Sequence, residues 1–264
     1  MSVVILWTLR QRKRSIIGWS IGVAAFIFIN LIFYPSFKDQ AAELQKSFEN
    51  LPDAAVQLLG GSTDFFSPVG FMNSQIFFIM LPLLFGILAI NLGSKLLAQE
   101  EQENTIELLL ARPISRSKLL AAKANSGIII LTIVAAVSLL VTILVSKAVG
   151  VEIGSAPLIA ATFMCFVLAL SFGAIAFMIS AFGKARAISL GVATAVALGG
   201  YLISSLSNTV SWLEAPSKIL PFNYYKSEAI LSGNADWSYL VYFAVLLFVA
   251  WLISVSIFRK RDIG

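Results

Sequence analysis

Long apolar runs alternate with shorter polar connections along the whole chain. Six of these runs contain no Asp or Glu and approach or exceed the roughly 20 apolar residues that a transmembrane helix needs. We therefore expect an all-α polytopic membrane protein whose 264 residues form a single transmembrane domain. The predicted spans cover about residues 16–34, 71–97, 124–146, 158–182, 187–212 and 238–258. Pro82 lies inside the second span, where it should kink the helix and free a backbone carbonyl.

Basic residues are concentrated in alternate connections. Of the 19 Lys and Arg residues, most lie before the first span, in the 95–123 region, in the 183–186 turn and after the last span. The connections on the other side hold only Lys38, Lys46, Lys147, Lys218 and Lys226. Since an excess of Lys and Arg marks the cytoplasmic side, we expect a multi-pass cell-membrane protein with both termini in the cytoplasm.

Composition excludes several classes of protein. Hydrophobic residues make up 58% of the chain and charged residues 12%, about half the charged share of a soluble domain. The pI is near 9.4, but the basic residues form short separate clusters rather than one face, so no nucleic-acid partner is expected. The chain has no His, and its one cysteine, Cys165, lies in an apolar run as a buried thiol. The first apolar run exceeds the length of a signal-peptide core and predicts a membrane helix.

Two connections on the outer side carry patterns of their own. In the external loop 35–70, apolar residues recur with helical spacing from Phe37 to Leu51. They predict an amphipathic helix that either lies on the membrane surface or packs on the bundle, and that Pro52 and Gly60-Gly61 end. In the 213–237 connection, the aromatic segment 221–225 predicts either an interfacial anchor, which we favour, or a partly re-entrant segment.

The predicted spans lack acidic residues, and Lys95 is the one basic residue within their limits. Ion-coupled transporters and charged-ring channels generally need ionisable groups in the membrane, so any uphill transport should draw its energy from elsewhere. Small residues instead recur at four-residue steps, a spacing that lets helix backbones approach closely. These residues pack either within one bundle or at a homodimer seam or next to a pathway there. They are Gly18 and Gly22 of the first span and Gly183, Ala187, Gly191, Ala195 and Gly199 along the fifth.

The cytoplasmic segment 98–123 combines an acidic face, an apolar end and a forced break. Glu100, Glu103 and Glu107 share one helical face, where their mutual repulsion would be relieved by a basic partner surface. Pro113 excludes the preceding residue from the α region, so a first helix should stop there, and Ser115 is placed to cap a second. An ordinary solvated loop with a charge run is the alternative.

This segment resembles the cytoplasmic signature of the permeases of type-2 ABC exporters. The matching residues are Glu100-Glu101, Thr105, Glu107, Leu109-Leu110, Pro113, Ser115-Arg116 and Lys123, with Asn104 where that family usually has Gly. Weaker resemblances involve Ser67–Gly70, Leu81–Leu83, Pro221-Phe222, Tyr224-Tyr225 and Phe258–Asp262.

The resemblance implies a permease subunit that pairs with a second copy, as a homodimer, and with two ABC ATPase subunits. The pathway would lie near the second and fifth spans of both protomers, and a coupling helix would dock in a groove of the ATPase. The chain has no G-x-x-x-x-G-K-[ST] phosphate loop, so ATP and Mg would be bound by the partner and no cofactor, metal or catalytic residue is expected here. The expected ATPase interface is Glu100, Glu101, Glu103, Thr105, Glu107, Leu108, Leu109, Arg112, Pro113, Ser115 and Arg116.

Two other functions stay open on the sequence. A membrane scaffold or sensor subunit that binds an ATPase but transports nothing could use the same cytoplasmic helix. An intramembrane enzyme has less support, since the predicted spans hold no paired carboxylates and the chain has no His.

Overall fold

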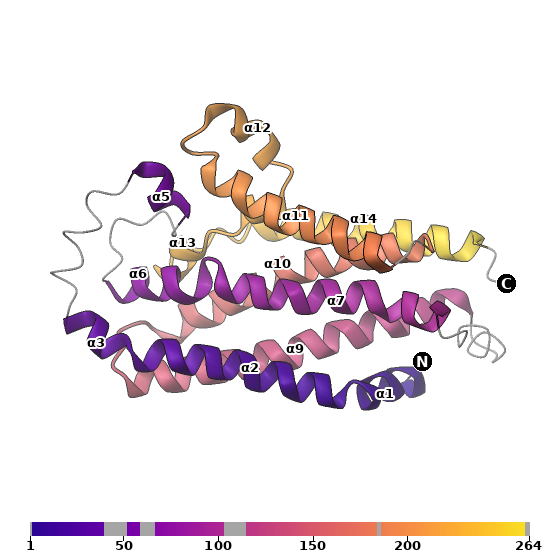
Figure 1. The fold of residues 1–264 in the computed structure, drawn as a ribbon, viewed down its shortest axis with the longest axis horizontal. Coiled ribbons are helices and arrows are strands. Elements are labelled where there is room, and N and C mark those ends of the chain that lie inside the picture. The colour runs from indigo at the N-terminus through magenta and orange to yellow at the C-terminus, as the bar shows by residue number, and fades with distance from the viewer. Residues whose placement is uncertain (1, 40–51, 59–66, 103–114, 184–185, 262–264) are drawn as a thin grey trace.

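The computed structural model describes residues 2–39, 52–58, 67–102, 115–183 and 186–261 (Figure 1). Within these ranges all regular structure is helical, and six helical segments are long and apolar enough to cross a membrane. The predicted fold class and the predicted number of spans are therefore confirmed. The segments are Lys13–Lys38, Pro68–Leu97, Arg116–Ala148, Ser155–Ala181, Arg186–Leu206 and Tyr239–Lys260.

Two of these segments consist of more than one helix. The first combines α2 (Lys13–Ile32) with α3 (Tyr34–Asp39), and the second combines α6 (Pro68–Met72), the π-helical η1 (Asn73–Phe77) and α7 (Met80–Gln102). The other four are α9 (Arg116–Ala148), α10 (Ser155–Ala181), α11 (Arg186–Leu206) and α14 (Tyr239–Lys260). The remaining described elements are α1 (Ser2–Gln11), α5 (Asp53–Leu58), η2 (Ser211–Leu213), α12 (Glu214–Ser217), η3 (Pro221–Tyr224) and α13 (Ser227–Leu231).

The long helices lie side by side, with α7 and α10 packed together at the centre (Figure 1). At their crossing, a Cβ added to Gly93 would lie 2.2 Å from the carbonyl oxygen of Gly173, so only glycine allows this approach. The outer helices keep large apolar side chains on their surfaces; Ile21 of α2 and Phe248 of α14, for example, are 63% and 61% exposed. Apolar residues on both the inner and outer faces are typical of helices surrounded by lipid.

Both described ends of the chain lie at the same end of the bundle (Figure 1). The end of α7 and the start of α9 also lie there, whereas α3, α5, α6 and α13 lie at the opposite end. The fifth span ends at Leu206, earlier than the predicted 212. The polar run that follows explains this difference, because Ser, Asn and Thr side chains offer the backbone alternatives to helical hydrogen bonds; the Ser207 hydroxyl, for example, donates to the Ser204 carbonyl at 2.9 Å.

The second span is broken just upstream of Pro82. Ser67 caps α6 by accepting a hydrogen bond from the Gly70 amide at 3.0 Å, and the helix then widens into η1, where the Phe78 amide donates to the Asn73 carbonyl. The Phe77 carbonyl accepts a hydrogen bond from the Tyr225 hydroxyl at 2.7 Å. An irregular stretch is therefore present, but it lies before Pro82, and the carbonyl that Tyr225 binds belongs to Phe77 rather than to Phe78, the residue four before the proline.

The connection before the last span packs inside the protein. Tyr225 is 6% exposed, and α13 contacts α6, η1 and α10. The Ser227 hydroxyl donates to the Asn73 carboxamide at 2.6 Å. The interfacial-anchor interpretation is therefore wrong for Tyr225, whose ring and hydroxyl are both buried in the bundle. Burial raises the pKa of Tyr225 well above its usual value, so the hydroxyl keeps its proton and can donate.

Residues 2–11 form a helix that the sequence interpretation missed. This helix, α1, packs on α9, with Val4, Leu119 and Ala122 buried together. Lys123 is 2% exposed, and its Nζ lies 5.4 Å from the centroid of the Trp7 ring. The apolar face of α1 thus covers a buried cation at the start of α9, where a cation–π contact compensates part of its lost hydration.

The external loop is described only in part. The helix predicted from Phe37 to Leu51 falls mainly on residues 40–51, which lie outside the described residues. The short α5 follows Pro52, and the carbonyl of its last residue, Leu58, accepts a hydrogen bond from the Tyr201 hydroxyl of α11 at 2.6 Å.

Candidate functional site

The described parts of the predicted coupling segment, at the end of α7 and the start of α9, lie at the end of the bundle that holds both described chain ends (Figure 1). Glu100 and Glu101 belong to the last turn of α7, Ser115 is the residue that precedes α9, and Arg116 is its first residue. Ser115 has the extended backbone of an N-cap, but its side chain makes no capping hydrogen bond, so the predicted position is right and the bond is not formed. The other predicted interface residues lie outside the described residues: Glu103, Thr105, Glu107, Leu108, Leu109, Arg112 and Pro113.

Arg116 makes an interaction within the chain. Its guanidinium donates a hydrogen bond to the main-chain carbonyl of Arg261, just beyond the end of α14. The Arg261 guanidinium in turn lies against Gly183, which has a φ of +71° directly after α10. The ends of α9, α10 and α14 are thereby joined at one junction, which we call the terminal junction.

Gly183 therefore does not belong to the small-residue face on which the sequence interpretation placed it. It ends α10 in the left-handed conformation that favours glycine, and it leaves room for the Arg261 side chain. Its position just past an apolar run, at the usual place for a helix-ending glycine, was the available signal.

The other small residues of that face make little or no packing contact with the described residues. Gly18 and Gly22 of α2, and Ala187, Gly191 and Ala195 of α11, are all exposed. A Cβ at Gly18, Gly22, Gly191 or Gly199 would meet no atom within 4 Å of it. Among the described residues, no packing within the bundle is found at these glycines. The opposite face of α11 packs inward, through Ser189, Ala193 and Gly200.

A cavity of about 210 Å³ lies between α7 and α11. Apolar side chains form most of its wall, and the Phe222 and Tyr201 rings lie 5.7 Å apart in an edge-to-face contact in this lining. Polar groups are few: the Arg186 guanidinium lies 3.3 Å from the Asn91 carboxamide oxygen, and both residues line the cavity. An apolar cavity with a few polar groups is typical of sites for organic molecules.

Arg186 is the residue of this cavity that sequence reasoning missed. The sequence interpretation counted it in the 183–186 turn, whereas it is the first residue of α11 and its Nε is buried. A cation one residue before an apolar run does not reveal that its side chain will fold back onto a neighbouring helix.

The described residues offer no ready metal site, since no three His, Cys, Asp or Glu side chains among them are grouped to hold a metal ion. Cys165 is a buried free thiol, as predicted.

The fold defines a polytopic α-helical membrane protein with a mainly apolar cavity between two of its spans. A model of one protein family, described as ABC-2 family transporter protein, matches residues 4–263, and the chain belongs to this family. It is thus a membrane subunit of an ABC transporter, as the resemblance implied. A comparison with curated proteins finds no match.

Proposed function

We propose that this chain is the permease subunit of an ATP-driven exporter. Two copies form the translocation pathway in the cell membrane, and separate ATPase subunits bind on the cytoplasmic side, where both termini lie. The observation that carries the proposal is the cavity between α7 and α11, in a chain of this transporter family. Its mainly apolar wall suits a lipidic, peptidic or drug-like cargo.

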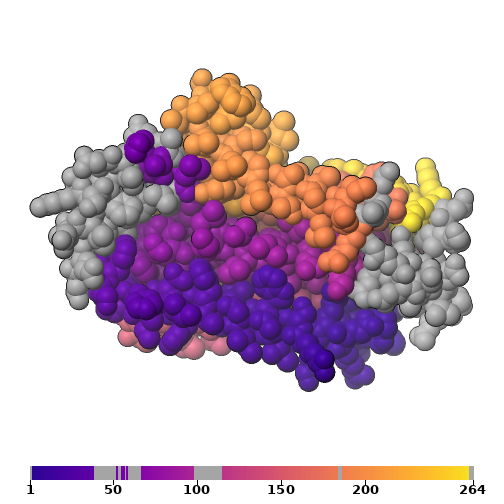
Figure 2. Space-filling model, in the orientation of Figure 1, coloured from indigo at the N-terminus to yellow at the C-terminus, as the bar shows by residue number. Residues whose placement is uncertain are grey.

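The second copy is inferred from the surface beside this cavity. In Figure 2, α2 and α11 flank the exposed part of α7 on one face of the molecule, and the segment around α12 stands out beside α11. The small residues of α2 and α11 are exposed and would let the helices of a second copy approach closely. A homodimer joined through this face would bring two α7–α11 cavities next to each other.

The continuous helix α7 would couple the ATPase-binding segment to the cavity. This helix runs without interruption from Met80 to Gln102, so Asn91 in the cavity and Gln102 are eleven residues, or about 16 Å, apart on one rod. A push on the acidic segment that begins at Glu100 would therefore displace the cavity wall. The predicted spans contain no acidic residue that could carry protons or cations, which supports ATP as the energy source.

Reconstitution in liposomes tests the proposal against a non-transporting scaffold. The chain and its co-purifying ATPase are inserted together, and ATP-dependent movement of amphipathic fluorescent compounds across the membrane is measured. We expect ATP-dependent transport that Thr194→Phe reduces, because Thr194 lines the α7–α11 cavity. Ala244→Phe, at an exposed position of α14, is the matched control. ATP hydrolysis without transport of any compound would favour the scaffold.

The coupling segment is tested with Glu107→Lys. We expect this change to abolish the stimulation of ATPase activity by the permease while the protein stays inserted. Glu107 is preferred over Arg116 because the Arg116 guanidinium also binds the Arg261 carbonyl, so its replacement would disturb the terminal junction as well. Glu228→Lys, at the opposite end of the bundle, serves as the charge control (Figure 1). Unchanged complex formation and turnover would contradict a coupling role.

A further inference from the structure

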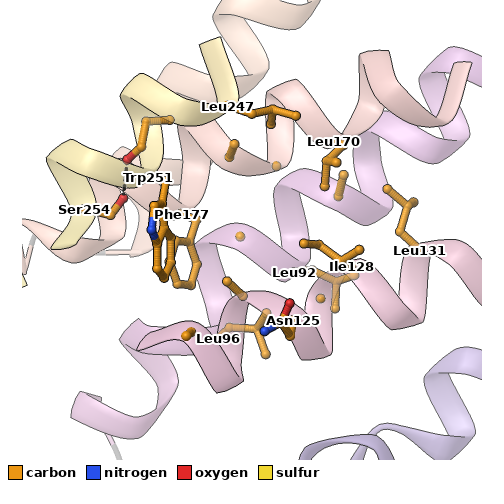
Figure 3. A pocket seen from close by; sticks show the side chains of 18 residues that line it. Leu92, Leu96, Asn125, Ile128, Leu131, Leu170, Phe177, Leu247, Trp251 and Ser254 are labelled. Atoms are coloured by element: carbon orange, nitrogen blue, oxygen red, sulfur yellow. Dashed lines mark hydrogen bonds between the residues drawn. The ribbon is translucent and has the colours of Figure 1, made fainter. Parts of the chain in front are cut away.

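A second and larger cavity lies on a different face of α7. It has a volume of about 290 Å³ and lies between α7, α9, α10 and α14. Figure 3 shows Leu92, Leu131, Leu170 and Leu247, from different helices, arranged around its space. Ala89, Leu92, Gly93 and Leu96 of α7 line this cavity, whereas Gly86, Ile87, Ile90 and Asn91 line the cavity beside α11. At 100° per residue these two sets lie on roughly opposite sides of the helix, so α7 separates the cavities.

Small residues create the space. Gly93 and Gly173 meet at the close crossing of α7 and α10, and neither has a side chain that could project into the cavity. The four helices all contribute alanine or glycine to the cavity wall, and none of these side chains is long enough to fill the cavity. The small residues of the lining are Ala89, Gly93, Ala121, Ala124, Gly127, Gly173, Ala174 and Ala250.

The solvent exposure of the lining residues shows which part of the cavity is buried and where it opens. Leu92, Leu131 and Ala250 are only 5%, 1% and 5% exposed, and they form its inner part, which we call the floor. Ile128 of α9 is 37% exposed, and Leu247 and Trp251 of α14 are partly exposed. The mouth therefore lies between α9 and α14, on helices that cross the membrane.

The lining favours hydrocarbon over water. None of the 18 lining residues is charged, and the polar side-chain groups among them are the Asn125 carboxamide, the Ser254 hydroxyl and the indole N–H of Trp251. The Ser254 hydroxyl already donates to the Ala250 carbonyl at 2.7 Å. A buried water needs about two to four polar partners, and the Asn125 carboxamide and the Trp251 indole N–H cannot supply them for a cavity of this size. Apolar cavities of this kind stay dry and take up apolar molecules.

We propose that one acyl chain of a membrane phospholipid enters between α9 and α14 and occupies this cavity. Around the mouth, acyl chains are the surrounding solvent, so the occupant is present at very high local concentration. A volume of about 290 Å³ has room for roughly ten groups the size of a water molecule, and a methylene group is of similar size. A flexible acyl chain can adapt its conformation to such a space.

Photolabelling in lipid nanodiscs tests the proposal. The intact protein is placed in phospholipid that carries a diazirine within one acyl chain, irradiated, digested and examined by mass spectrometry for carbene adducts. We expect adducts at the floor residues Leu92 and Leu131, in addition to exposed positions such as Leu140. Lipid that merely surrounds the protein cannot reach the floor, because those residues are almost fully buried.

Matched variants on α9 separate cavity binding from surface contact. Ala124→Phe projects a ring into the cavity and should remove most of the label from Leu92, while the label at Leu140 stays unchanged. Ala136→Phe lies twelve residues further along the same helix, at an exposed position outside the cavity, and should leave the label at Leu92 unchanged. Ala174→Leu fills the cavity from α10 and provides a second variant if Ala124→Phe does not fold.

Three results would overturn the proposal. The first is the absence of adducts at the floor residues while Leu140 is labelled, and the second is floor labelling that persists in both filled variants. The third is floor labelling by a soluble single-chain alkyl diazirine but not by the phospholipid, since the occupant would then be a free apolar compound rather than a lipid chain.

Discussion

Two glycines that follow long helices adopt the left-handed backbone conformation. Gly183 and Gly150 both have a φ above +70°, at +71° and +74°. The two glycines differ in their surroundings: the Arg261 guanidinium lies where a side chain at Gly183 would be, whereas a Cβ at Gly150 would meet nothing within 4 Å. Comparing substitutions at the two glycines therefore separates the cost of backbone strain from the cost of displacing Arg261 at the terminal junction.

We therefore predict that Gly183→Ala destabilises the protein more than Gly150→Ala. Both substitutions place alanine in the left-handed region at a cost of about 1 kcal/mol, but only the first displaces the Arg261 side chain. The measurement is the thermal unfolding temperature of each purified variant in detergent. Adding Arg261→Ala should abolish the excess loss in Gly183→Ala, and equal losses in the two single variants would mean that the contact with Arg261 contributes nothing.

Tyr225 is the second residue with a defined energetic role. Tyr225→Phe keeps the buried ring but leaves the Phe77 carbonyl without its partner in a broken part of the second span. We predict a loss of about 1–3 kcal/mol, the usual effect of an unsatisfied buried group. Tyr242→Phe, whose hydroxyl donates to the Ile219 carbonyl at an exposed site, should lose less. Chemical unfolding of the three proteins in detergent measures the difference, and a smaller loss for Tyr225→Phe would contradict it.

At the scale of helices, the exposed small residues of α11 predict an effect on assembly rather than on folding. Gly191→Leu adds a side chain where nothing lies within 4 Å in one protomer, so the isolated chain should keep its stability. At a close helix seam between two copies, the same side chain should weaken the dimer. Subunit counting by single-molecule photobleaching in nanodiscs checks this, with Ala244→Leu of α14 as the control. Loss of monomer stability with an intact dimer would contradict the homodimer seam.

The six spans could be predicted because their length and apolar composition are local properties of the sequence. The same is true of the helix start after Ser115, whereas Pro82 indicated an irregular second span but not its position at residues 73–79. Contacts between distant segments could not be predicted in this way: Tyr225 on the Phe77 carbonyl, Arg186 on Asn91 and Arg261 on Gly183 depend on which helices become neighbours. The exposure of the small residues of α11 could not be predicted either. It depends on how α11 is oriented in the bundle, and the sequence pattern fits both a buried and an exposed face. The residues 103–114 of the coupling segment stay a prediction.

At the scale of the whole molecule, every proposal about coupling depends on which side of the membrane the terminal junction faces. Arg259 lies at the end of α14, near the junction, and Trp212 follows α11 at the other end of the bundle and is 74% exposed (Figure 1). Cys165 is fully buried and should not react, so single cysteines can be added without removing it. We predict that a membrane-impermeant maleimide labels Trp212→Cys in intact cells and Arg259→Cys only after permeabilisation. The opposite pattern would put the acidic segment after Glu100 outside the cell, where no ATP-driven subunit could push on α7, and the proposed exporter mechanism would fail even though the fold and the lipid cavity would stand.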